Sequence, residues 1–142
     1  MPQRTENNFW LLKTEPTEYS WHDLVHDKVT SWSGISNATA LIHLRAMKPR
    51  DLALIYHTGS ERACVGIAEI VKGPYPDPRA GNPKLVAVDI MAKQPLEVAV
   101  TLQQIKADPA FVGFDLLRIS RLSVVPVPAE MWKRLLTLAK MA

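Results

Sequence analysis

The stretch Phe9-Trp10-Leu11-Leu12-Lys13-Thr14-Glu15-Pro16 sets the start of the fold in this 142-residue chain. Its first four residues are apolar, so residues 9–14 predict a strand that is central in its sheet and covered on both faces. Pro16 ends the strand, because proline cannot donate a hydrogen bond to a sheet ladder. We therefore expect Trp10 to pack in the core.

Two further tryptophans lie in turn-like surroundings. They are Trp21, in Tyr19-Ser20-Trp21, and Trp32, in Trp32-Ser33-Gly34-Ile35-Ser36-Asn37. A large aromatic side chain in a turn either closes the end of a core or offers a flat wall on which something stacks. For Trp21 the sequence leaves both a lid and core packing open, whereas for Trp32 it favours the stacking wall.

The composition is that of an ordinary globular protein, with 47% hydrophobic and 22% charged residues. By length we expect a single domain over residues 9–142, preceded by a disordered tail over residues 1–8. The net charge of +3 permits a phosphate-bearing partner without demanding one. No apolar stretch approaches the roughly 20 residues that span a bilayer, so we expect no membrane role.

Cysteine and histidine give no sign of a metal centre. The single cysteine, Cys64, lies in an apolar run and is expected to be a small buried hydrophobe, which is consistent with a reducing, cytoplasmic location. The four histidines do not combine with a carboxylate or thiolate at metal-ligand spacing. We therefore expect no metal and no other cofactor.

The remaining pattern predicts an α+β fold whose sheet is bent enough to be a small barrel. Besides residues 9–14, strands are predicted over 52–57, 63–71, 85–92 and 116–125, the last with a β-bulge near Ser120-Arg121, and residues 73–83 are predicted to be a loop. A capping box at Ser20 and Asp23 predicts a helix to about Val25, and Thr101 with Gln104 predicts another. Further helices are predicted from Ser36 or Asn37 to Lys48 and over 128–140.

Several polar residues are candidates for a binding site. His57 ends an apolar strand, where it is either a partly exposed histidine or a hydrogen-bonding partner of a ligand. Lys13 ends the first strand and either pairs with Glu15 or contacts a ligand. Arg118 lies either on a solvated strand face or on a positive rim for phosphates, together with Arg45, Lys48, Arg50 and Arg62.

The ordered motifs resemble the EVE domain family over residues 9 to about 138. They are Trp10-Leu11-Leu12-Lys13-Thr14-Glu15-Pro16, Tyr19-Ser20-Trp21-His22-Asp23-Leu24, Trp32-Ser33-Gly34-Ile35-Ser36-Asn37, Leu44-Arg45-Ala46-Met47-Lys48, Tyr56-His57-Thr58, Val65-Gly66-Ile67-Ala68, Asn82-Pro83-Lys84 and Arg121-Leu122-Ser123-Val124. The resemblance implies a PUA-like fold, a bent antiparallel β-barrel with flanking short helices and a C-terminal helix, related to the YTH readers of modified bases.

The resemblance also implies a function, which is non-catalytic binding to DNA or RNA that carries a modified base, with modified cytosine favoured. Separately, we expect the protein to be a monomer. Trp32 would be the stacking wall, and Ser33 and Asn37 would offer hydrogen bonds to the base edge. The pocket would be lined or bordered by Lys13, Thr14, Ser20, Trp21 and His57. Three positions depart from the usual family pattern: Ser36 and Leu41 replace arginines, and Leu85 replaces an aromatic residue, which would leave the cage aromatic on one side.

The alternative function is that of an enzyme similar to the ASCH family, an amidohydrolase acting on a modified cytidine. Lys13, Thr14 and Glu15 supply suitable residue types for such a site. However, neighbouring side chains on a strand alternate between its faces, so Lys13 and Thr14 are not expected to point into one pocket without a bulge. This spacing favours binding over catalysis.

Overall fold

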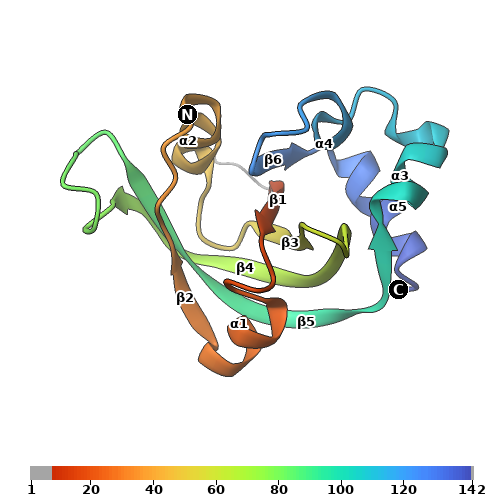
Figure 1. Ribbon diagram of the computed structural model, residues 1–142, viewed down its shortest axis with the longest axis horizontal. Helices are drawn as coiled ribbons and strands as arrows, with labels where there is room; N and C mark the ends of the chain where they lie inside the picture. The colour runs from red at the N-terminus through yellow and green to blue at the C-terminus, as the bar shows by residue number, and fades with distance from the viewer. Residues whose placement is uncertain (1–7, 142) are drawn as a thin grey trace.

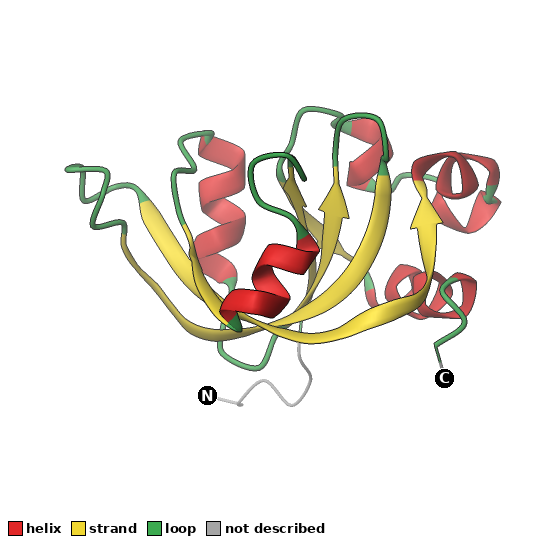
Figure 2. Ribbon diagram, turned by 60° about the horizontal axis from the view of Figure 1, so that its bottom comes forward, coloured by secondary structure: helices red, strands yellow, loops and turns green. Residues whose placement is uncertain are grey.

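The computed structural model describes residues 8–141, which form a curved six-stranded sheet with helices around it (Figures 1 and 2). Along the sheet the strand order is β2-β5-β4-β3-β1-β6. The strands are β1 (Phe9–Thr14), β2 (Val29–Trp32), β3 (Leu52–His57), β4 (Ala63–Pro76), β5 (Val86–Thr101) and β6 (Val124–Val127). The helices are α1 (Trp21–Asp27), α2 (Ala38–Ala46), α3 (Leu102–Ala107), η1 (Pro109–Phe111), α4 (Asp115–Arg118) and α5 (Ala129–Leu138).

The predicted α+β class and the bent sheet are confirmed. Neighbouring strands pair antiparallel, except that β1 runs parallel to β3 with Phe9 opposite Leu52. Figure 1 shows α3, α4 and α5 gathered at one end of the molecule and α2 toward the other. No helix in residues 8–141 has the length and apolar character needed to cross a membrane.

Strand β1 lies inside the sheet, between β3 and β6, as its apolar sequence predicted. Leu11 and Leu12 are fully buried, and Trp10 is 4% exposed. The indole Nε1 of Trp10 donates to Oδ2 of the buried Asp51 at 3.0 Å, so the polar atom of this core side chain is satisfied. At the start of β1, the ring of Phe9 stacks on that of Trp132 at 4.5 Å between centroids, which docks α5.

The predicted helix starts are confirmed by their caps. Ser20 with Asp23 and Thr101 with Gln104 both form reciprocal capping boxes, and Asn37, rather than Ser36, caps α2. Helix α1 continues two residues beyond the predicted Val25. The backbone N–H of Asn8, the last residue of the predicted tail, donates to Oδ1 of Asp51. Residues 1–7 of the predicted tail lie outside the described residues.

Strand β2 was not predicted, and Trp32 was placed in a turn. Trp32 instead ends this short edge strand, which pairs antiparallel with β5 and places Trp32 opposite Val88. Lys28 has a positive φ of 69°, so the chain turns sharply out of α1 and directly into the four-residue strand.

The prediction of a loop over residues 73–83 and of a strand ending at Ala92 was wrong at both boundaries. Strand β4 continues to Pro76, since its last residues pair with β5 alone and no longer with β3. That free edge tolerates proline, which has no N–H to offer a neighbour. Strand β5 continues to Thr101 through several register shifts that bend the pair.

The predicted strand over residues 116–125, with its bulge, was also wrong. Residues Asp115–Arg118 form α4, a turn follows, and β6 begins only at Val124. The change of phase between Leu117-Ile119 and Leu122-Val124 therefore marks the passage from helix to strand. Arg118 consequently lies on a helix, and not on a strand face.

Candidate nucleic-acid interface

A cleft of about 500 Å³ lies across the C-terminal end of β1 and the end of β2. We call it the tryptophan cleft. It combines two aromatic side chains with hydroxyl groups and with charges of both signs, and its lining residues are Lys13, Thr14, Glu15, Glu18, Tyr19, Thr30, Ser31, Trp32, Ser33, Ile35 and Arg79. Four predicted site residues, Lys13, Thr14, Trp32 and Ser33, are thus brought together here.

The aromatic wall of the cleft is Trp32, held from the side by Tyr19. The two rings meet edge to face, with centroids 6.2 Å apart and planes at 76°. The hydroxyl of Tyr19 donates to Oδ2 of Asp27 at 2.8 Å, which fixes the supporting ring, and burial raises the pKa of that hydroxyl. Trp32 is half-buried and packs against the core on part of its surface, so its indole is anchored and still borders the cleft.

The chain after Trp32 is held by Asp77, a residue in the loop between β4 and β5 that the sequence did not single out. Its Oδ2 accepts from the backbone N–H of Gly34 at 2.9 Å, and its Oδ1 accepts from that of Arg79 at 2.9 Å. The hydrogen bond from Gly34, followed by the one from Arg79, lowers the pKa of the Asp77 carboxyl. A charged carboxylate therefore ties the Trp32 side of the cleft to the Arg79 side.

Lys13 and Thr14 both border the tryptophan cleft, although they are consecutive residues of β1. The cleft reaches across the end of the strand, so both faces of β1 meet it there. Their polar atoms still diverge as the alternation predicted: the Thr14 hydroxyl donates to the carbonyl oxygen of Tyr19 at 2.7 Å, and Lys13 Nζ donates to that of Ser120 at 2.8 Å. Burial lowers the pKa of the Lys13 ammonium.

For Lys13 the sequence left two alternatives, an ion pair with Glu15 or a contact with a ligand. The hydrogen bonds of both residues do not support the ion pair. Glu15 accepts from the backbone N–H and hydroxyl of Thr17 and from the hydroxyl of Thr58, not from Lys13. The hydrogen bond from the Thr17 N–H is the main reason that the pKa of Glu15 is lowered. The ion pairs within residues 8–141 do not include Lys13, so its charge is not neutralised by a carboxylate.

Trp21 packs on the sheet and does not line the tryptophan cleft. Its ring lies directly over Gly66 of β4, so closely that a Cβ at position 66 would come within 2.5 Å of Cε2 and Cε3 of the indole. Only glycine leaves room for this ring. Of the two roles left open for Trp21, packing is the one that its contacts support.

His57 and Ser20 both serve the start of α1. Nε2 of His57 accepts from the backbone N–H of Trp21 at 2.9 Å, and Nδ1 lies 2.7 Å from Oε1 of Glu61. With Nδ1–H donating to Glu61, this neutral tautomer satisfies both ring nitrogens. The Ser20 hydroxyl accepts from the N–H of Asp23. Both residues therefore support the aromatic segment from behind the tryptophan cleft, and neither lines it.

Asn37 and Arg118 also lie outside the lining of the tryptophan cleft. The amide oxygen of Asn37 caps α2 by accepting from Ala40 N–H at 2.9 Å, which leaves its NH₂ group as the atom that could reach a ligand. Arg118 pairs with Asp115 on α4 at 2.9 Å. Their ligand contacts stay predictions. Leu85, the predicted opposing wall, packs against the core and is likewise not among the lining residues.

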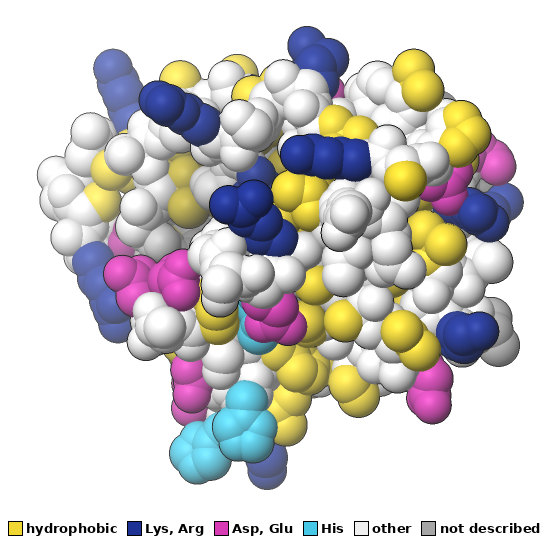
Figure 3. Space-filling view, turned by 45° about the vertical axis from the view of Figure 1, so that its right-hand side comes forward, with side chains coloured by type: hydrophobic (Ala, Val, Ile, Leu, Met, Phe, Trp, Pro, Cys, Tyr) yellow, Lys and Arg dark blue, Asp and Glu magenta, His cyan; other side chains and the backbone are white. Residues whose placement is uncertain are grey.

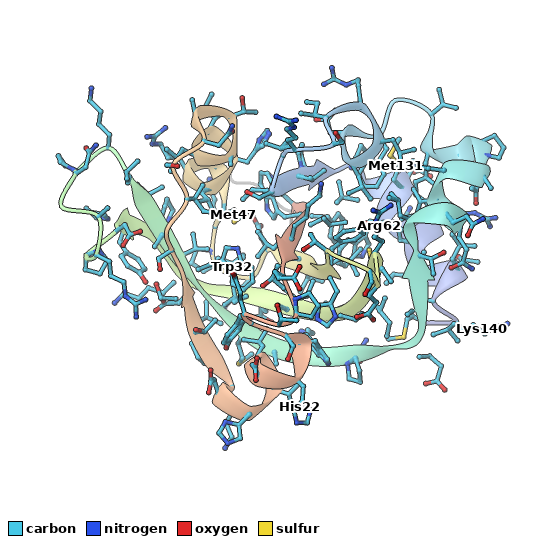
Figure 4. All side chains as sticks on the ribbon, in the orientation of Figure 1. His22, Trp32, Met47, Arg62, Met131 and Lys140 are labelled. Atoms are coloured by element: carbon cyan, nitrogen blue, oxygen red, sulfur yellow. The ribbon has the colours of Figure 1, made fainter. Side chains whose placement is uncertain are left out.

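Figure 4 shows Trp32 on one side of β1 and Arg62 on the other. The described residues contain no group of three or more His, Cys, Asp or Glu side chains placed to hold a metal ion. The arrangement around Trp32 is thus an open, hydroxyl-lined cleft with one flat aromatic wall, which suits a planar ligand with polar edges.

The fold is that of a small α+β domain built on a curved sheet, and the chain belongs to the EVE domain family, whose profile matches residues 8–138. Thymocyte nuclear protein 1 of Rattus norvegicus is 30% identical over 93% of this chain and 74% of its own length. A Rhodopseudomonas palustris protein solved by NMR is 41% identical, with a TM-score of 0.90 over 94% of this chain and 93% of its own.

Human THYN1, solved in complex with DNA that contains 5-methylcytosine, has the same fold. Its TM-score is 0.88 at 26% identity, over 96% of this chain and 99% of the human chain. An ASCH protein from Zymomonas mobilis matches with a TM-score of 0.58 at 15% identity, over 92% of this chain and 94% of its own. That last similarity concerns the fold alone and carries no activity to this chain.

Proposed function

We propose that this protein binds nucleic acid carrying a modified base, modified cytosine in DNA first of all, without acting on it chemically. The base would enter the tryptophan cleft and stack on Trp32, with Ser33 and the hydroxyl-bearing residues of β2 near its polar edge. The observation that carries the proposal is the half-buried Trp32 ring, braced edge-on by Tyr19 and bordering a cleft of about 500 Å³. The DNA complex of the human relative supports the class of ligand.

The physical requirements of base reading agree with this proposal. A base must leave its stack to be read by an enclosed pocket, and an aromatic wall worth about 1–3 kcal/mol per base offsets part of that cost. A methyl group adds only about 1–3 kcal/mol of discrimination through pocket shape. The cleft supplies one such wall together with hydrogen-bonding side chains.

The alternative amidohydrolase receives no support from the contacts of its candidate residues. The Thr14 hydroxyl donates its proton to the carbonyl oxygen of Tyr19, and not to a side chain that could act as a base. Lys13 Nζ donates to the carbonyl oxygen of Ser120, and not to the Thr14 hydroxyl. Non-catalytic binding is therefore the function that we propose.

The test compares Trp32→Ala, Trp32→Phe and the wild type for binding to an oligonucleotide with one 5-methylcytosine and to its unmodified counterpart, by fluorescence anisotropy at one stated salt concentration. We expect Trp32→Ala to lose about 5- to 150-fold in affinity for the modified strand, which corresponds to about 1–3 kcal/mol of stacking. Trp32→Phe keeps an aromatic face and should retain most of the affinity.

Unfolding in urea shows whether each variant is folded before binding is compared. Equal affinity of Trp32→Ala and wild type for the modified strand would overturn the proposed site. Equal affinity of the wild type for both strands would overturn the proposed preference. Measuring the affinity for an RNA oligonucleotide of the same sequence shows whether the protein prefers DNA or RNA. The monomeric state and cytoplasmic location stay predictions.

A further inference from the structure

A second cleft, of about 370 Å³, lies on the other side of Lys13. We call it the basic cleft and define it by Lys13, Tyr56, Thr58, Arg62, Lys106 and Ser120. These residues come from the ends of β1 and β3, the loop before β4, helix α3 and the turn after α4. Residues far apart in the sequence thus meet at the place where β1 ends.

The basic cleft collects positive charge without an acidic partner. Lys13, Arg62 and Lys106 line it, and none of its lining residues is Asp or Glu. Lys13 Nζ donates to the Ser120 carbonyl oxygen at 2.8 Å, and Arg62 Nε donates to that of Gly59 at 3.1 Å. Carbonyl partners orient these cations but leave their charge uncompensated.

The nearest carboxylates are not among the lining residues and accept hydrogen bonds from groups other than the three cations. Glu61 lies 2.7 Å from Nδ1 of His57, and Glu15, which borders the tryptophan cleft, accepts from Thr17 and Thr58. Within the part of the chain that the structure describes, no ion pair involves Lys13, Arg62 or Lys106. Figure 3 shows Lys and Arg side chains on the upper part of one face, with hydrophobic side chains between them. An anion in the basic cleft would therefore meet three unpaired cations.

Lys13 connects this cleft with the proposed base site. It lines both clefts, and Trp32 and Arg62 lie on opposite sides of β1 (Figure 4). A strand whose base stacks on Trp32 and whose backbone crosses Lys13 would carry its next phosphate toward Arg62. The hydroxyl of Ser120 and the apolar side chains of Leu102 and Leu116 complete a surface suited to a phosphate and its sugar.

We propose that the basic cleft binds a backbone phosphate of the nucleotide adjacent to the base held in the tryptophan cleft, through Lys13, Arg62 and Lys106. The proposal rests on the proposed function, since it assigns the path of the same nucleic-acid strand. A guanidinium suits this role because its donors match phosphate oxygens, and lysines add charge. Contacts of this kind fix position and carry no sequence information.

The test measures the affinity of single-stranded oligonucleotides, with and without 5-methylcytosine, over a series of salt concentrations. The variant is Arg62→Gln/Lys106→Gln, and the matched control is Lys133→Gln/Lys140→Gln, which removes two exposed cations that line neither cleft. Each phosphate contact contributes about 0.7 to the slope of log affinity against log salt for a single strand.

We expect the cleft variant to lower that slope by about 0.7–1.4 and to weaken both oligonucleotides on the order of tenfold at low salt. The ratio of the two affinities should not change, and the control should keep the wild-type slope. A cleft variant with the same slope as the control overturns this inference, even where Trp32→Ala still abolishes the preference for the modified base. A reduced slope without any such preference leaves the phosphate site standing and overturns the proposed function. A wild type that binds neither strand overturns both.

Discussion

Replacing Gly66 by alanine is expected to destabilise the protein because of a single contact. A Cβ at this position would lie 2.5 Å from Cε2 and Cε3 of the Trp21 indole. Trp21 is the first residue of α1 and its backbone N–H is held by His57, so the indole has to turn about its side-chain torsions to relieve the contact. Forcing one extra carbon into a filled space costs about 1–3 kcal/mol.

The backbone itself does not oppose the substitution. Gly66 is not among the glycines with a left-handed φ, so alanine fits its conformation. Replacing glycine by alanine at such a site gains about 0.4–1 kcal/mol, because the unfolded chain loses freedom. The expected net loss of unfolding free energy is therefore between about 0 and 2.6 kcal/mol. If the ring alone is responsible, Gly66→Ala should be neutral or stabilising in a Trp21→Ala background.

The assay is a double-mutant cycle in urea, with the wild type, Gly66→Ala, Trp21→Ala and the combined variant. The two substitutions should couple by about 1–3 kcal/mol. The slope of free energy against urea concentration shows whether the compactness of the states is comparable in all four proteins. Additivity to within about 0.5 kcal/mol would refute the reasoning, since residues that do not contact one another add in this way.

Two further predictions concern ionisable groups. Burial raises the pKa of the Cys64 thiol to about 12, so the native protein should react with a disulfide reagent at pH 8 only as fast as it opens, whereas urea-unfolded protein should react at once; fast labelling of the native protein would contradict this. The hydrogen bond from the Gly34 N–H lowers the pKa of the Asp77 carboxyl in the folded protein. The stability that the charged carboxylate contributes is therefore fully present above its pKa in the unfolded chain, about 3.9. This stability is lost as the pH falls through the lower pKa of the folded protein. Urea unfolding at pH 5 and pH 3 should therefore show a larger loss in the wild type than in Asp77→Asn, and equal losses would contradict the assignment.

The sequence was sufficient to predict the elements whose signals lie in adjacent residues of the chain. The capping boxes at Ser20 and Thr101 and the apolar run of β1 need no distant partner to be recognised. Strand β2 and the long end of β5 were missed because their pairing is what makes them strands. Four-residue Val29–Trp32 has no pattern of its own that outweighs the adjacent turn residues.

The site was predicted in part for the same reason. Trp32 could be chosen because an aromatic beside Ser and Gly is unusual, and Lys13 because it ends an apolar strand, whereas Ser33 was chosen only through the family resemblance. Asp77 lies between two prolines, and nothing near it in the sequence points to Gly34, which is 43 residues away. His57 was chosen for the position that it does occupy, at the end of β3, but its ring nitrogens meet Trp21 and Glu61.

The position of Leu85 bears on how such a protein could bind tightly. Leu85 does not line the tryptophan cleft, and the Tyr19 ring meets Trp32 edge-on, so Trp32 is the one flat wall that the cleft offers. In the proposed function the base therefore has one aromatic face, and stacking supplies about 1–3 kcal/mol. Specific protein–DNA complexes exceed nonspecific ones by about 4–10 kcal/mol. A single wall falls short of that difference, so edge contacts must supply the discrimination, and phosphate contacts of the kind proposed for Arg62 and Lys106 must supply much of the affinity.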